Sequence, residues 1–418
     1  MRHRYRVVAA MLVVGGVVAM SSGVAFASRP AAKASYTVMM IAPQPGFGLD
    51  WSLGQHAFWD ATNASGGVDG HTINLTQCFD GTFVAQTQDQ VYTCAESAVS
   101  SHVLAVVGSN SDFDSVAYPV LAANHIPDIG SFPTTPIDNT SLESVPFLIP
   151  EVVFPAGYAI QLKQVAHCKK AADVVGANSP LTKEQEDAFA AGAKWAHLKI
   201  APAVAVPTTQ SDFAPTIAIL DGEGVDCIGI STPLQPSAVL GPLLTAIKDS
   251  GHPMRVTFTG VGITSTAFKA IGPAINGVIA LVSGEDDALV NLVQPARVTP
   301  PERTMINEWN KYYPAATPDA NLDMPGWVGA DATAIVMNQA VKEHLAITGA
   351  NLTKVLRSNF TINTGVEPPA NFSSPGLIPG YNRIHNTYVN YIKIVNYEEQ
   401  PIDFKLHNVA QSLAHFRG

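Results

Sequence analysis

The sequence predicts an α/β protein with two doubly wound parallel-sheet lobes that are joined by a multi-strand hinge. Short apolar runs alternate with longer amphipathic stretches along most of the chain, which is typical of a parallel sheet covered by helices. The chain has 418 residues, more than a single hydrophobic core usually supports. Its composition, 47% hydrophobic and 14% charged residues, is that of a folded globular protein.

The chain begins with the pattern of a secretory signal peptide. A basic start, "MRHRYR", precedes an uncharged apolar run, and the small residues of "AFA" end at Ala27. We therefore expect residues 1–27 to be removed and the remainder to be exported to the periplasm or the exterior of the cell envelope. An uncleaved anchor is the alternative, but the run is short for a membrane span of about 20 residues. No cysteine lies close after this apolar run, so no lipobox is expected.

The first lobe is predicted from residues 36–150, with residues 283–370 returning to it. Strands are expected over 36–43, 71–80, 103–109 and 126–132, and helices over 51–64, 84–101 and 114–125. The glycine-rich stretch "NASGGVDG" separates the first helix from the second strand. Glycine in that place is predicted to end the helix and turn the chain, away from the edge where a ligand would bind.

The second lobe is predicted from residues 151–282, with residues 371–418 returning to it. Strands are expected over 169–178, 201–206, 225–232 and 254–262, and helices over 155–167, 183–197, 214–224 and 237–251. Further helices are predicted over 300–313 and 329–349, followed by a Pro/Gly-rich stretch and a final strand over 386–399. Hinges are expected near Pro150, near Val282 and around 365–382.

Four cysteines suit disulfide bonds in an exported protein. Cys78, Cys94, Cys168 and Cys227 allow three pairings, of which Cys78 with Cys94 is favoured because they lie near the end of a strand and within the next helix. Cys168 and Cys227 each lie beside an apolar strand. Four buried free thiols are the alternative. No Cys/His spacing suggests zinc, and neither a metal nor a cofactor is expected.

The net charge of the chain limits the classes of partner that it is expected to bind. The net charge of −10, with no cluster of Lys and Arg after residue 6, argues against binding to nucleic acid or anionic lipid. Polar residues instead follow two predicted strands, in "GSNSDFDS" (108–115) and "GSFPTTP" (130–136). Because the carboxyl ends of parallel strands and the helix N-termini meet at one edge of a sheet, these segments could bind a small anionic group. Helix capping alone is the alternative for the first of them.

The order of these landmarks resembles a known family. "NASGGVDG", then "LAVVGS", then "IPDIGSFPTTP" is similar to the type I periplasmic solute-binding proteins, in particular the Leu/Ile/Val-binding branch that serves ABC transporters. The resemblance implies that a ligand carboxylate is held by hydroxyls and backbone N–H groups of the two polar segments. Its predicted residues are Ser109, Ser111, Asp112, Ser115, Ser131 and Thr134. The opposite wall of the cleft is predicted from Asn178, Ser179, Thr232, Gln235 and Thr259, with Trp51 stacking on the ligand or packing under its own loop.

The sequence departs from that family's amino-acid binders at one point. Directly after "MRVTF" (254–258), the chain has Thr259 or Gly260 at the place where the resemblance implies an acidic partner for the ligand ammonium. That partner is therefore Asp112, Asp114 or Glu285, or else the ligand has no ammonium group, because a buried unpaired ammonium is costly.

The expected function is that of a non-catalytic, monomeric receptor. It captures a small-molecule solute by hinge closure and delivers it to an ABC permease. The alternatives are an exported enzyme and a ligand-sensing domain on the same fold. None of the nucleophile-elbow, zinc-protease or P-loop motifs occurs in the sequence, and the acidic "GEDDAL" (284–289) is interpreted as a solvated loop.

Overall fold

The computed structural model describes residues 33–45, 52–82, 85–177, 182–207, 210–231, 239–260, 263, 265–283, 298–313 and 320–416. Six of the predicted features lie outside the described residues: the signal peptide (1–27), Trp51, Asn178 with Ser179, Thr232, Gln235 and Glu285. Within the described part of the chain, no helix is long and apolar enough to cross a membrane.

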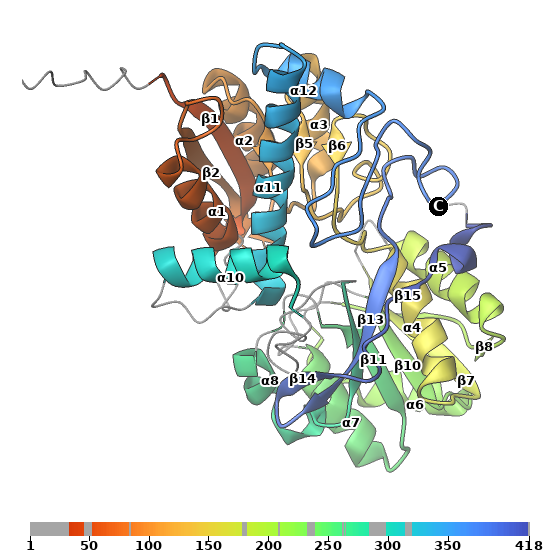
Figure 1. The fold of residues 1–418 in the computed structure, drawn as a ribbon. Helices are drawn as coiled ribbons and strands as arrows, with labels where there is room; N and C mark the ends of the chain where they lie inside the picture. Colours follow the sequence, from red (N-terminus) through yellow and green to blue (C-terminus); the bar gives the residue numbers. More distant parts are fainter. Residues whose placement is uncertain are drawn as a thin grey trace, which may run out of the picture. The chain divides into compact units, whose positions relative to one another are not determined.

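The first sheet has six strands in the order β3-β2-β1-β4-β5-β6 (Figure 1). Neighbouring strands are parallel except for the short antiparallel pair of β2 and β3. The strands are β1 (Tyr36–Gln44), β2 (Ile73–Thr82), β3 (Ala85–Gln86), β4 (Val106–Val107), β5 (Asp128–Ile129) and β6 (Ser144–Val145).

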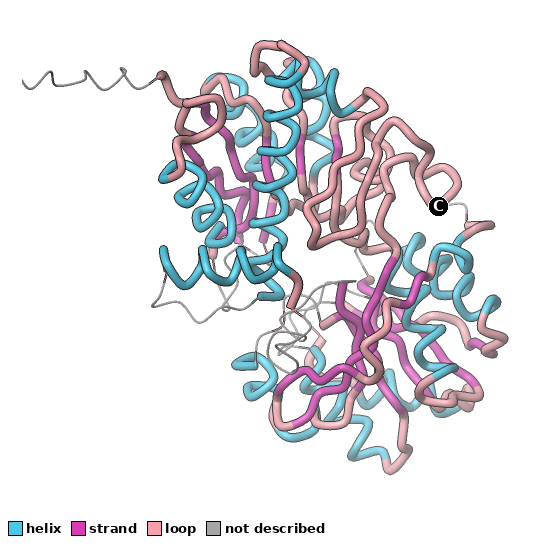
Figure 2. The backbone as a smooth tube through the Cα atoms, viewed as in Figure 1, coloured by secondary structure: helices cyan, strands magenta, loops and turns pink. Residues whose placement is uncertain are grey.

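Helices cover both faces of this sheet, as a doubly wound fold requires (Figure 2). Successive strand residues point to opposite faces, and Val38 packs with α1 and α11 whereas Met39 packs with α2 and α3. The helices are α1 (Ser52–Ala64), α2 (Gln88–Ser100), α3 (Asp114–Ala123), α10 (Pro300–Tyr312), α11 (Ala320–Lys342) and α12 (Gly349–Leu356).

The second sheet has the order β14-β13-β12-β11-β10-β7-β8, with β15 beside β13 and β9 beside β7. The strands are β7 (Lys170–Gly176), β8 (Lys199–Ile200), β9 (Val204–Val206), β10 (Cys227–Ser231), β11 (Arg255–Thr259), β12 (Ile279–Ser283), β13 (Tyr388–Val395), β14 (Glu398–Pro401) and β15 (His407–Asn408). Strands β7 to β12 are parallel, and the returning β13, β14 and β15 are antiparallel to their neighbours.

Helices α4 and α5 belong to one hydrophobic core of this second sheet, and α6 and α7 belong to another. The helices are α4 (Val153–Gln164), α5 (Thr182–Trp195), α6 (Ala214–Gly222), α7 (Gly241–Ser250) and α8 (Ser265–Ile271), with 3₁₀ turns η2 (Pro273–Ile275) and η4 (Ala410–Leu413). Both sheets therefore have the doubly wound arrangement that the sequence predicts.

The chain passes from one sheet to the other three times. It does so between β6 and α4, after β12, and in the segment before β13. The last crossing is fixed by Arg383, a buried side chain that donates hydrogen bonds to the carbonyl oxygens of Ser144 (2.6 Å), Phe372 (3.1 Å) and Leu142 (3.3 Å). These crossings coincide with the three predicted hinge positions.

The glycine-rich turn after α1 has the predicted role. Gly67 has a φ of +73° and donates to the carbonyl of Thr62, which ends the helix. Asp69 and Gly70 then both have positive φ between the bridged residues Val68 and His71, as in a tight two-residue turn. The stretch leads directly into β2, so it belongs to the scaffold.

The final strand differs from its prediction. The structure divides residues 386–399 at Asn396 and Tyr397, which both have positive φ, into the antiparallel pair β13 and β14. The run has no glycine, the usual marker of such a turn, and a continuous strand was therefore predicted. Helix α11 also begins before its predicted start, with Pro325 inside it.

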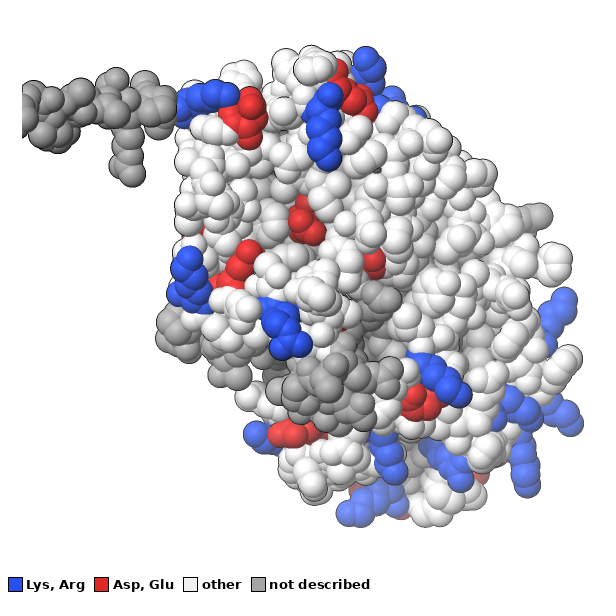
Figure 3. Space-filling view, in the orientation of Figure 1, with Lys and Arg blue, Asp and Glu red and all other residues white. Residues whose placement is uncertain are grey.

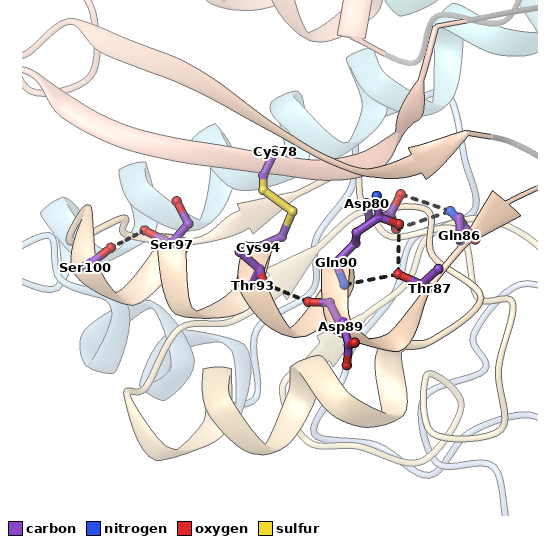
Figure 4. Close-up of a disulfide and its surroundings, with 10 residues drawn as sticks. All are labelled: Cys78, Asp80, Gln86, Thr87, Asp89, Gln90, Thr93, Cys94, Ser97 and Ser100. Atoms are coloured by element: carbon purple, nitrogen blue, oxygen red, sulfur yellow. Dashed lines mark hydrogen bonds between the residues drawn. A yellow bond between two sulfur atoms is a disulfide. The ribbon is translucent and has the colours of Figure 1, made fainter.

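Both disulfide bonds join elements that pack against each other. Cys78 of β2 is bonded to Cys94 of α2, as predicted (Figure 4), and Cys168 is bonded to Cys227 of β10. Among the described residues no cysteine is free. The bonds close loops of 16 and 59 residues, respectively.

Candidate functional site

The carboxyl ends of β4 and β5 are shaped by glycines that let a helix approach closely. Gly108 and Gly130, which follow the two strands, have φ values of +59° and +80°. A Cβ atom on Gly130 would lie 2.2 Å from the Cα of Gly329 in α11, and one on Gly329 would lie 3.2 Å from the Cα of Gly108. Both polar segments therefore begin at glycines that lie directly against α11.

The first polar segment, residues 108–115, is held by neighbours on several elements. The buried Ser109 donates its hydroxyl to Asp128 of β5, and Asn110 donates its amide to the carbonyl of Ile41 at 3.0 Å. Ser111 is also buried, whereas Asp112 and Ser115 are exposed. Ser109 and Ser111 are therefore the buried side chains of the segment and Asp112 and Ser115 the exposed ones, and the contact of each with a ligand stays a prediction.

The second polar segment, residues 130–136, is bonded to the first. The amide of Phe132 donates to the carbonyl of Ser109 at 2.9 Å, and the Thr134 hydroxyl donates to the carbonyl of Ser111 at 2.5 Å. Ser131 is fully buried, and its hydroxyl has no hydrogen-bond partner among the described residues. The structure thus brings the four predicted residues Ser109, Ser111, Ser131 and Thr134 together at one edge of the sheet.

A carboxylate at the end of β2 extends this network. Gln86 of β3 donates to both carboxylate oxygens of the buried Asp80, at 3.1 and 3.2 Å (Figure 4). Its side-chain carbonyl oxygen accepts from the backbone amide of Asp112 at 2.9 Å. Burial raises the pKa of Asp80 to about 6, against the effect of hydrogen bonds from Ser111 and Gln86. The first polar segment is therefore hydrogen-bonded to residues of three strands: Ile41 of β1, Gln86 of β3 and Asp128 of β5.

Two further ionisable side chains, Glu151 and Tyr158, lie near this region. Glu151 precedes α4, and its amide donates to the carbonyl of Pro133 at 3.1 Å. Burial, followed by the charges of Asp112 and Asp138, raises the pKa of Glu151 to about 8. Tyr158 of α4 is hydrogen-bonded to Thr259 at the end of β11, and its own pKa is raised mainly by burial. Glu151 therefore lies near groups of the first sheet, and Thr259 contacts a helix that packs on the second.

Sequence reasoning missed Glu151, Asp80 and Tyr158. The signal for Glu151 is an isolated acidic residue in the apolar run "FLIPEVVF", and Asp173 in "KKAADVVG" has the same character. Asp173 lies buried in β7, and burial raises its pKa well above the ordinary value. A single acid inside an apolar strand pattern is a useful marker because burying its charge is unfavourable.

Trp327 is a core residue. It is 3% exposed, packs edge-on against Phe58 at 5.4 Å between ring centroids, and donates its indole N–H to Glu308 at 2.8 Å.

On the face drawn in Figure 3, Lys and Arg side chains lie in separate groups among acidic and uncharged ones.

The fold defined by these two sheets is shared with solved structures of binding proteins. The branched-chain amino acid transporter protein LivJ from Streptococcus pneumoniae, in complex with isoleucine, has a TM-score of 0.70 and 12% identity over 89% of this chain and 100% of that one. A solute-binding protein from Rhodopseudomonas palustris in complex with p-hydroxybenzoic acid has a TM-score of 0.71 and 16% identity, over 91% and 100%. A fatty acid ABC transporter substrate-binding protein from Thermomonospora curvata has a TM-score of 0.71 and 15% identity, over 90% and 94%.

These structures establish a class, the type I periplasmic binding protein fold with two lobes. The family model described as "Periplasmic binding protein" matches residues 39–376, and the chain belongs to that family. A comparison with curated protein sequences gave no match. The chain is thus a periplasmic binding protein by family and by fold.

Proposed function

We propose that this protein is an extracytoplasmic receptor that captures a small polar or amphipathic solute between its two lobes and delivers it to an ABC permease. The observation that carries the proposal is the family match over residues 39–376. In this proposal the protein acts as a monomer, by hinge closure, without a cofactor and without converting its ligand.

The proposed site has its carboxylate-binding part on the two polar segments. Support comes from the position of residues 108–115 and 130–136 at the carboxyl ends of parallel strands, where ligands of open α/β sheets bind. The solutes named for the three similar structures, isoleucine, p-hydroxybenzoic acid and fatty acids, combine an apolar body with a carboxylate. Trp51, Asn178, Ser179, Thr232, Gln235 and Thr259 remain the proposed residues of the other contacts.

An ammonium group on the solute would need an acidic partner. Asp112 is exposed at the edge of the first polar segment, whereas Asp114 is 3% exposed, so Asp112 is the accessible candidate of the two. Glu151 lies within electrostatic range of Asp112, but with its pKa raised to about 8 it is largely uncharged at neutral pH, so Asp112 is the member of the two that carries the charge. We therefore assign the ammonium contact, where the solute carries one, to Asp112.

Thermal shift with defined solutes tests this proposal. L-isoleucine and 3-methylpentanoate share a side chain and a carboxylate and differ in the ammonium group, while p-hydroxybenzoate and octanoate vary the apolar body. A bound solute at 100 times its Kd stabilises the folded state by about 2.7 kcal/mol. Stabilisation without turnover supports a receptor, and product formation would contradict it.

Thr134 is the residue on which the carboxylate assignment is tested. Thr134→Ala should lower the affinity for whichever carboxylate stabilises the protein, because its hydroxyl ties the two polar segments together through the carbonyl of Ser111. Loss of one such bond, about 1 kcal/mol, should weaken binding by about fivefold. Thr134→Ser keeps the hydroxyl and is the matched control for the bond to Ser111. Equal affinity of Thr134→Ala and wild type would show that the carboxylate lies elsewhere.

Export is tested separately. The mature protein should be recovered outside the cytoplasm with Ser28 as its first residue, which N-terminal sequencing determines. A start at Met1 in the exported fraction would favour an uncleaved anchor instead.

A further inference from the structure

Three carboxyl groups are buried together beneath the two polar segments. Asp114 begins α3, Asp128 lies in β5, and Asp138 follows the second polar segment, and they are 3%, 1% and 0% exposed. Each has an oxygen that no donor reaches among the described residues: Oδ2 of Asp114, Oδ1 of Asp128 and Oδ1 of Asp138. Three buried charges without counter-ions would be very unfavourable.

Asp138 organises the second polar segment through its other oxygen. Its Oδ2 accepts from the backbone amides of Thr134 (3.0 Å) and Thr135 (2.6 Å) and from the Thr135 hydroxyl (2.8 Å). Because Thr134 in turn donates to the carbonyl of Ser111, this carboxyl group also supports the link between the two segments.

Asp114 is the direct neighbour of Asp138. The two buried carboxyl groups lie close enough to shift each other's pKa, and the pKa of Asp114 is raised by this neighbour whereas that of Asp138 is lowered by it, so a hydrogen bond between them would have Asp114 as the protonated donor. A hydrogen bond between two carboxyl groups needs a proton, and one proton satisfies an orphaned oxygen on each side. A metal ion is a poorer explanation, because the only grouping of three ligand atoms at metal-binding spacing in the described chain contains the disulfide-bonded Cys168 and Cys227.

We propose that Asp114 and Asp138 share one proton at neutral pH, and that this singly protonated pair is the positioning unit that holds the two polar segments of the candidate site in register. The inference rests on the proposed function only in naming those segments as ligand-binding. The pair itself is defined by burial and hydrogen bonding. Neither residue is proposed to touch the solute.

The groups around the pair favour retention of the proton. The titratable and charged groups facing it or its immediate neighbours are Asp80 of β2, Asp112, Tyr118 of α3, Asp128 of β5, Glu151 before α4 and Arg383 of the last crossing. Burial first, then the charges of Asp138 and Asp128, raise the pKa of Asp114 well above its ordinary value, and burial raises that of Asp138 to about 6. A second negative charge here would repel several others.

The sign of the pH effect follows from these directions. A carboxyl group whose pKa is raised on folding contributes stability that is fully present below its unfolded pKa of about 4 and is lost as pH rises through the folded value. The two polar segments should therefore be most rigid in mildly acidic solution and should loosen as the pair loses its proton above neutrality.

The test replaces the shared proton with one that cannot dissociate. The amide of Asp114→Asn can donate to Asp138 at every pH, whereas Asp114→Ala removes the donor. Asp89→Asn changes an exposed acid in the first turn of α2 and is the matched control. Urea unfolding, thermal midpoints and hydrogen exchange at the amides of Thr134 and Thr135 are measured from pH 5.5 to 8.5 without any solute.

Asp114→Asn should flatten the fall in midpoint with rising pH and exceed wild type at pH 8.5 by about 2–4 °C. Protection of the two amides should persist in Asp114→Asn at that pH and be lost in Asp114→Ala at all pH values, while Asp89→Asn keeps the wild-type slope. A wild-type slope in Asp114→Asn, or equal loss in the Asn and Ala variants, would overturn the proposal. Because no solute is present, that failure is distinct from failure of the receptor function.

Discussion

Single glycines set the position of the candidate site. At Gly130 two requirements coincide, a φ of +80° and the absence of a Cβ atom where α11 lies against the strand end. Gly251, the C-cap of α7, has a similar φ of +74°, but a Cβ atom there would meet nothing within 4 Å. A side chain at Gly251 would therefore meet backbone strain alone, whereas one at Gly130 would meet backbone strain and a steric clash.

This contrast gives a prediction. Gly251→Ala should lower the free energy of unfolding by about 1–2 kcal/mol, the cost of a left-handed alanine. Gly130→Ala adds overpacking against Gly329 to that cost, and about 3 kcal/mol or more should be lost in total. Urea unfolding of both variants measures the difference. Equal losses would mean that α11 moves aside freely.

Five histidines lie just after the ends of helices in the left-handed backbone conformation. His102, His125, His167, His197 and His344 follow α2, α3, α4, α5 and α11, and all five are exposed with φ between +51° and +58°. Glycine is the usual residue where a helix ends in this left-handed conformation, and histidine adopts it only with some strain.

Replacement of these histidines by glycine should therefore stabilise the protein. His102→Gly is expected to raise the free energy of unfolding by about 0.5–1 kcal/mol, since relief of strain exceeds the added entropy of the unfolded chain. The double variant with His197→Gly should show the sum of the single effects, because the two positions belong to different sheets. Chemical denaturation checks both, and a loss of stability would show that the side chains make contacts that outweigh the strain.

The disulfide bonds should differ in what they contribute. In the chain-entropy account, the 16-residue loop of Cys78–Cys94 is worth about 3 kcal/mol and the 59-residue loop of Cys168–Cys227 about 4 kcal/mol. When unfolding is followed under oxidising conditions, replacing Cys168 and Cys227 by serine should therefore lower the free energy of unfolding more than replacing Cys78 and Cys94. The reverse order would indicate that strain or residual structure, rather than loop length, decides.

Periodicity was sufficient to predict most elements but not their finer divisions. Helices α1, α5 and α7 were predicted because their apolar residues recur at helical spacing. The hairpin of β13 and β14 was missed because Asn396 and Tyr397 replace the expected glycine turn. In the candidate site, the polar segments were predicted from their composition, but Glu151 and Asp80 come from distant parts of the chain and become neighbours only in the folded structure.

At the scale of the whole molecule, buried acids dominate the expected response to pH. Burial raises the pKa of Asp128 to about 7, of Glu151 to about 8 and of Asp331 to about 7. His385 acts in the opposite direction, since burial and the charge of Arg383 lower its pKa to about 4. Acids with raised pKa values lose stability as pH rises, and a histidine with a lowered pKa loses it as pH falls below about 6.5.

The balance predicts a protein that is most stable in mildly acidic solution. From about pH 5 to pH 8.5 the free energy of unfolding should fall steadily, because several carboxyl groups lose protons in the folded state that they have already lost in the unfolded one. Below about pH 6.5 the protonation of His385 in the unfolded state opposes this gain, and the gain itself ends as pH approaches the unfolded pKa of the acids, about 4, so a maximum near pH 5 is expected. Urea unfolding across this range, with His385→Gln to move the maximum toward lower pH, measures the effect. A maximum at or above pH 7 would mean that water or bound cations reach the acids that the fold encloses.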